Sequence, residues 1–147
     1  MKKIIVSLMA LAAVLMVLPG TALATDYGKQ KVVYHINGGD PQQNQGALRN
    51  VQNHINAVGA ENIDVKVVMH GAGLNLLINA KENENLRAAV DNLKMQNVGF
   101  QVCNNTVVGR KLDVSKDLYD AKAEDVIPSG VAHLSYLQAQ GYTYVKP

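Results

Sequence analysis

The sequence is poor in cysteine, tryptophan and phenylalanine, and these shortages limit how the fold can be held together. Cys103 is the only cysteine among 147 residues, so no disulfide can form within the chain. Tryptophan is absent and phenylalanine occurs once. With no disulfide and few aromatic side chains, the fold depends on a mostly aliphatic core.

A net charge is also missing outside the first residues of the chain. Lys2 and Lys3 supply the whole formal net charge of +2, and residues 25–147 carry equal numbers of acidic and basic side chains. A neutral chain has no overall electrostatic attraction to polyanions. We therefore expect neither nucleic acid nor an anionic membrane surface as a partner.

Long apolar runs are absent except for one at the N-terminus. It covers residues 4–18, follows two lysines and precedes Ala-Leu-Ala at positions 22–24. This order is typical of a secretory signal peptide, and the run is shorter than the ~20 apolar residues that cross a membrane. We predict a signal peptide at residues 1–24, a single domain at residues 25–147, a periplasmic location and no membrane association after cleavage.

Strand-like and helix-like patterns alternate along the rest of the chain. Runs of β-branched and apolar residues predict five strands, at residues 31–36, 63–69, 98–102, 125–127 and 142–145. The clearest helix starts at Pro41, behind the N-cap Asp40, and stops at Gly59. Shorter helical patterns cover residues 86–93 and 115–119. Such alternation predicts an α/β fold with a mainly parallel sheet and helices on both faces.

Two local expectations concern the loops at the ends of strands. Residues 70–73 contain two glycines and are expected to form a flexible loop. Ser129 is a suitable N-cap for a last helix, in which Val131, Leu134 and Leu137 are expected to share one apolar face.

Side chains that are suited to catalysis or ligand binding follow the predicted strands. In open parallel sheets, ligands bind beyond the carboxyl ends of the strands, near the point where the strand order reverses. The candidate catalytic residues at these ends are Cys103, His70 and His35. The candidate substrate-binding residues are Asn37, Gly71, Asn104, Asn105, Thr106 and Ser129.

The thiol of Cys103 is the most reactive of these side chains. A cysteine reacts as its thiolate, and hydrogen-bond donors such as Thr106 and nearby backbone N–H groups favour that form. His70 or His35 can move protons because imidazole titrates close to neutral pH. His54 and His133 fall within predicted helices and are interpreted as structural or surface residues.

Other uses of these residues receive less support from the sequence. Free cysteine is among the most buried residue types, so an inert Cys103 stays open as an alternative. Cys103, His35 and His70 are potential metal ligands, but their spacing matches no compact metal motif, and no metal is predicted. Gly71 and Gly73 lack the third glycine and downstream acid of a dinucleotide site, and no cofactor is expected.

Four segments resemble the DsrE/DsrF-like family of small sulfur-relay proteins. They are Val-Tyr-His-Ile-Asn at 33–37, Val-Val-Met-His-Gly at 67–71, Gly-Phe-Gln-Val-Cys-Asn-Asn-Thr at 99–106, and Val-Ile-Pro-Ser-Gly-Val at 126–131 with Gly-Tyr at 141–142. The resemblance covers most of residues 31–147, and the segment around Cys103 is its most specific part.

The resemblance implies both a fold and a function. The fold is a three-layer, flavodoxin-like α/β structure that assembles into oligomers. Family members carry sulfane sulfur as a persulfide on a cysteine after the third strand, the position of Cys103, and exchange it with donor and acceptor proteins or small thiols. Two functions follow as hypotheses: an exported sulfur carrier or sulfurtransferase, or a non-enzymatic oligomeric binding protein with an inert cysteine.

Overall fold

A parallel sheet forms the centre of the computed structural model, which describes residues 25–147. The predicted signal peptide, residues 1–24, lies outside the described residues. Within them the sheet has five strands in the order β4-β3-β2-β1-β5, and every pairing is parallel. The strands are β1 (Gln30–Ile36), β2 (Ile63–Met69), β3 (Gly99–Cys103), β4 (Val126–Ile127) and β5 (Thr143–Val145).

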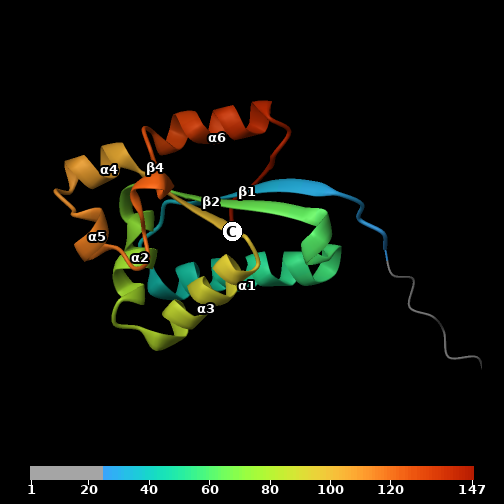
Figure 1. The fold of residues 1–147 in the computed structure, drawn as a ribbon, viewed down its shortest axis with the longest axis horizontal. Helices are drawn as coiled ribbons and strands as arrows, with labels where there is room; N and C mark the ends of the chain where they lie inside the picture. The colour runs from blue at the N-terminus through green and yellow to red at the C-terminus, as the bar shows by residue number, and fades with distance from the viewer. Residues whose placement is uncertain (1–24) are drawn as a thin grey trace, which may run out of the picture.

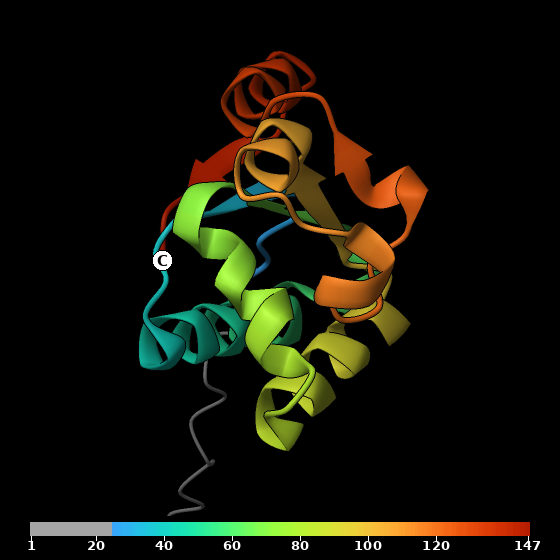
Figure 2. The same ribbon diagram turned by 90° about the vertical axis from the view of Figure 1, so that its left-hand side faces the viewer.

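Helices cover both faces of this sheet, which confirms the predicted α/β fold class (Figure 1). The α-helices are α1 (Pro41–Val58), α2 (Asn75–Ala80), α3 (Glu84–Met95), α4 (Asn104–Gly109), α5 (Val114–Asp117) and α6 (Gly130–Ala139). Short 3-10 helices are η1 (Ala60–Asn62), η2 (Gly71–Leu74) and η3 (Ala123–Asp125). Helices α1 and α3 lie on one face, α6 lies alone on the other, and α4 and α5 lie beyond one end of the strands (Figures 1 and 2).

The two faces have separate cores of unequal size. Alternation along β1 directs Val32, Tyr34 and Ile36 into a large cluster shared with α1, α2 and α3. Val33 points to the opposite face, where the smaller cluster contains only five buried residues among those described: Val33, Val68, Ile127, Leu134 and Leu137. The helix α6 is therefore held by far fewer apolar contacts than the helices on the other face.

Local signals in the sequence determine where α1 begins and ends. The Asp40 carboxylate accepts a hydrogen bond of 2.9 Å from the N–H of Gln43, and Pro41 occupies the first turn, where its missing N–H costs nothing. Gly59 ends the helix with φ of 91°, a conformation that few residues other than glycine adopt. The predicted boundaries of this helix are confirmed.

Two local expectations were wrong. Residues 70–73 are not a flexible loop: Gly71 to Leu74 form η2, which runs directly into α2, and Gly73 is buried against β1. Val131 does not share the buried face of α6 and is 66% exposed. The Ser129 cap starts the helix at Gly130, so the residues at i, i+4 and i+7 that face the sheet are Gly130, Leu134 and Leu137.

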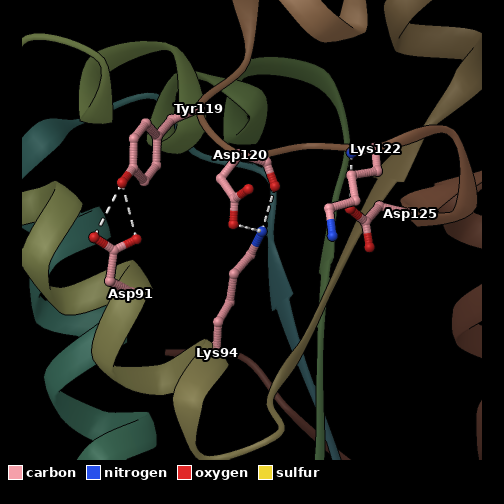
Figure 3. Close-up of polar contacts among 6 residues, drawn as sticks. All are labelled: Asp91, Lys94, Tyr119, Asp120, Lys122 and Asp125. Carbon is pink, nitrogen blue, oxygen red and sulfur yellow. Dashed lines mark hydrogen bonds and ion pairs between the residues drawn. The ribbon is translucent and has the colours of Figure 1, made fainter.

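The segment between α5 and β4 is anchored on α3 (Figure 3). The Tyr119 hydroxyl donates to both carboxylate oxygens of Asp91, at 2.9 and 3.0 Å. Lys94 forms an ion pair of 2.8 Å with Asp120 and also donates to its backbone carbonyl. These contacts fix the path of a segment for which the sequence predicts little regular secondary structure.

Within residues 25–147, no helix combines the length and apolar composition needed to cross a bilayer.

Candidate functional site

The thiol and two histidines come together at the carboxyl ends of the central strands. Met69 on β2 is paired with Val102 on β3, so His70 and Cys103, the next residues, lie side by side. His35 lies near the end of β1, the strand adjacent to β2. The register of three neighbouring strands therefore brings the candidate catalytic residues to one edge of the sheet.

The first residue of α6 closes this site on one side. A Cβ built on Gly130 would lie 2.9 Å from the Cβ of His70 and 3.3 Å from the Cβ of Cys103. Only a residue without a side chain allows α6 to approach both groups so closely. The N-terminus of α6 thus packs directly against the imidazole and the thiol.

Cys103 is almost fully enclosed, with 4% of its surface exposed. Burial raises the pKa of its thiol, but the N–H of Gly130, the N–H and hydroxyl of Thr106 and the N–H of Asn105 together lower it by more. The resulting pKa is below the ordinary value for cysteine. Hydrogen bonds from such donors lower the pKa because they stabilise the thiolate more than the thiol.

The two histidines are joined to each other. Nε2 of His35 lies 2.7 Å from Nε2 of His70, and their rings are 4.7 Å apart with an angle of 26° between the planes. Burial, together with the positive charge of Lys146, lowers the pKa of both side chains; for His35, proximity to His70 adds to the effect and the pKa falls to about 4. Both imidazoles are therefore neutral at pH 7.

Two residues from the C-terminal segment complete the site, and sequence reasoning missed both. The Tyr144 hydroxyl lies 2.6 Å from Nδ1 of His35. The Lys146 ammonium donates a hydrogen bond of 2.5 Å to the Asn37 side-chain oxygen. They reach the site because β5, only three residues long, pairs with β1 at the point where the strand order reverses. The reversal rule points to this place, but no local pattern pairs β5 with β1.

A hydrogen-bonded bridge holds the loops after β2 and β3 together. The N–H of Gly71 donates to the Thr106 hydroxyl oxygen at 2.8 Å. Arg110 donates to the Gly71 carbonyl at 3.2 Å and to the Asn75 side chain at 2.9 Å. The predicted pocket residues Gly71 and Thr106 are thus in contact, and Thr106 also faces the sulfur.

Two predicted pocket residues point their side chains elsewhere. Asn104 is exposed and lines a hollow with Asp113 and Val126. The Ser129 hydroxyl caps α6 by accepting from the N–H of Ala132 at 3.4 Å. Neither side chain has a contact that places it at the sulfur. Asn105 contributes its backbone N–H to the sulfur.

The remaining two histidines lie on helices, where they were predicted to be structural or surface residues. His54 on α1 is hydrogen-bonded to the Tyr34 hydroxyl at 2.9 Å and to the Gln30 side chain at 2.8 Å. His133 on α6 lies beside Tyr136, with the rings 5.6 Å apart. No group of three or more His, Cys, Asp or Glu side chains in the described part of the chain is arranged to hold a metal ion.

The chain is similar to a known family and to solved structures. The model of the DsrE/DsrF-like family matches residues 31–147. A protein of unknown function from Methanobacterium thermoautotrophicum, MTH1491, is 30% identical with a TM-score of 0.70, over 81% of this chain and 100% of that one. The ychN protein from E. coli is 18% identical with a TM-score of 0.63, over 80% of this chain and 99% of that one.

A search of curated proteins found no match. The family model nevertheless includes residues of all five strands together with Cys103, His35 and His70, and the MTH1491 structure is covered from end to end. On these grounds the chain belongs to the DsrE/DsrF-like family.

Proposed function

We propose that this protein is a periplasmic sulfur carrier or sulfurtransferase-like protein that holds sulfane sulfur as a persulfide on Cys103. The observation that carries the proposal is the set of donors around the sulfur, which favours the nucleophilic thiolate despite its burial. Membership of a family associated with sulfur relay supports the same chemistry.

The reaction is an exchange of sulfur between thiols. The Cys103 thiolate attacks the outer sulfur of a donor persulfide, a new S–S bond forms, and the donor's S–S bond breaks. The donor leaves as a thiolate that takes up a proton, and an acceptor thiolate later removes the sulfur by the same step. The exchange needs no external oxidant, reductant or cofactor, and its partners are sulfur donor and acceptor proteins or small thiols.

The enclosure of the thiol restricts how a donor can reach it. Cys103 is 4% exposed, and Gly130 of α6 lies against its Cβ. Attack on the sulfur therefore requires either a small donor or an outward movement of α6. A small sulfane donor is the appropriate first reagent for a test.

Intact mass spectrometry after incubation with a small-molecule persulfide tests the proposal directly. We expect the protein to gain the mass of one sulfur atom and to lose it again on treatment with a thiol. The variant Cys103→Ser should gain nothing. A wild-type protein that gains no sulfur from several donors would contradict the proposal.

The second candidate function is a non-enzymatic binding or assembly protein, and the burial of Cys103 favours it. Thiol titration of the native protein separates the two functions. Labelling of Cys103 only after denaturation favours the second candidate, and labelling of the folded protein favours the first.

Location and assembly are parts of the same proposal. The N-terminal sequence pattern supports export, which cell fractionation of the tagged full chain tests. Assembly into a homo-oligomer is supported by α6, which has no charged residue and exposes Val131 and Tyr136 by 66% and 58%. Light scattering of the eluted protein measures the oligomer mass, and a monomer would rule this part out.

A further inference from the structure

A chain of hydrogen bonds leads from the imidazole beside Cys103 to the surface. His70 is joined to His35 at 2.7 Å, and His35 is joined to the Tyr144 hydroxyl at 2.6 Å. Tyr144 is 42% exposed, whereas both histidines are partly buried. The tyrosine is therefore the end of the chain that meets solvent.

The proton positions along this series of hydrogen bonds depend on one another. Both imidazoles are neutral at pH 7, so in the contact between them one Nε2 carries a proton and the other is bare. A hydroxyl can donate a hydrogen bond or accept one. Whether the Tyr144 hydroxyl donates or accepts this hydrogen bond therefore determines the tautomer of His35. The tautomer of His35 in turn determines that of His70.

Two arrangements satisfy every contact. In the first, Tyr144 donates to Nδ1 of His35, His35 donates through Nε2–H to His70, and the His70 proton is on Nδ1. In the second, Tyr144 accepts from Nδ1–H of His35, His70 donates through Nε2–H to His35, and Nδ1 of His70 is bare.

Conversion of the second arrangement into the first moves one proton outward. Nδ1 of His70, the ring nitrogen that does not contact His35, gains a proton, and Nε2 of His70 passes its own proton to Nε2 of His35. Nδ1 of His35 passes a proton to the Tyr144 oxygen, which releases its original proton to water. Four transfers, two of them across the contacts of 2.7 and 2.6 Å, thus carry one proton through the pair of histidines to solvent without charging either imidazole at the end.

We propose that Tyr144 is a positioning residue, which sets the tautomers of His35 and His70 and forms the solvent end of a relay that exchanges one proton between the site and bulk water. Its use in sulfur exchange rests on the proposed function, in which the Cys103 thiol must lose a proton and the departing thiolate must gain one. The hydrogen-bonded arrangement itself does not depend on that function.

The variant Tyr144→Phe removes the hydroxyl and keeps the ring. The matched control is Tyr136→Phe, because Tyr136 is also exposed but lies on α6 beside His133. Nitrogen NMR of the histidine side chains in the full-length purified protein reports which ring nitrogen carries the proton. We expect Tyr144→Phe to change the nitrogen shifts of both His35 and His70, and Tyr136→Phe to leave both unchanged.

Sulfur loading of Cys103 supplies the second readout. We expect Tyr144→Phe to slow loading by about tenfold at pH 7, less than the loss expected for removing a general base, because both histidines remain. Unchanged histidine shifts in Tyr144→Phe would overturn the relay. If the wild-type protein takes up no sulfur, the proposed function fails, and the NMR comparison still decides whether Tyr144 sets the tautomers.

Discussion

Gly130 at the start of α6 lies so close to Cys103 at the end of β3 that a Cβ on the glycine would be 3.3 Å from the Cβ of the cysteine. The same atom would be 2.9 Å from the Cβ of His70, closer than carbon atoms normally approach. The position of α6, and with it the donor N–H that faces the sulfur, therefore depends on the absence of one methyl group.

The variant Gly130→Ala is expected to destabilise the fold by about 1 to 3 kcal/mol, the usual cost of forcing a methyl group into a packed site. Chemical denaturation measures the loss. Gly109→Ala is the matched control, since a Cβ there meets nothing within 4 Å. Equal stability of the two variants would contradict the close approach of α6 to the site.

The variant Gly73→Ala should be costlier still, about 3 kcal/mol or more, because its Cβ would lie 2.1 Å from the carbonyl oxygen of Ile36 and backbone cannot easily give way. Gly46 lies inside α1, where a Cβ would meet only the end of the Arg49 side chain, at 3.8 Å, so Gly46→Ala should instead stabilise the protein by up to about 1 kcal/mol. Thermal unfolding of both variants tests the contrast, and a stable Gly73→Ala protein would argue against the observed packing of η2 on β1.

The variant Thr106→Val should raise the pKa of Cys103, since the Thr106 hydroxyl is one of the groups that lower it. The pH profile of alkylation by iodoacetamide would then move to higher pH. Thr106→Ser keeps the hydroxyl and should leave the profile in place. A shift of equal size in both variants would contradict the role of the hydroxyl, since only the valine variant lacks it.

Stability should fall as the pH drops from about 6.5 towards about 4, because the pKa of all four histidines is lowered in the fold and that of His35 reaches about 4. In this window the unfolded chain binds protons that the folded protein does not, so acid favours unfolding. Melting temperatures across the range measure the effect, and His35→Gln should make the slope shallower. A melting temperature that does not change over this range would refute the prediction.

The variant Lys146→Met should raise the pKa of both His35 and His70, because the positive charge of Lys146 lowers both. Proton NMR titration of the two imidazoles measures the change, and Lys146→Arg, which keeps the charge, should show none. If Lys146→Met leaves both titrations unaltered, the C-terminal segment does not lie over the histidines in solution.

Much of the fold was predictable because its signals are local. Runs of β-branched and apolar residues predicted β1 and β2 within one residue, and Asp40, Pro41 and Gly59 marked both ends of α1. The side of α6 that faces the sheet was partly misjudged, since Val131 is exposed. There the helix phase is set by the close approach of Gly130 to the site, a contact between segments distant in sequence.

The candidate site was predictable only where strand ends mark it. Cys103, His70 and His35 each follow or end a β-rich run, and the rule that parallel strands share a carboxyl edge places them together. Tyr144 and Lys146 were missed because the predicted strand at residues 142–145 carries no signal that pairs it with β1, which lies more than a hundred positions earlier.

Because the core is divided unequally between the two faces of the sheet, α6 can separate from the sheet more easily than the other helices. Only α6 and a cluster of five buried residues cover the face on which the thiol lies, while the larger cluster on the other face needs nothing from α6. Local unfolding of such a lightly held element costs less free energy than global unfolding. The sulfur can therefore be uncovered while the sheet that aligns it with both histidines stays folded, and hydrogen exchange in α6 should be faster than in α1.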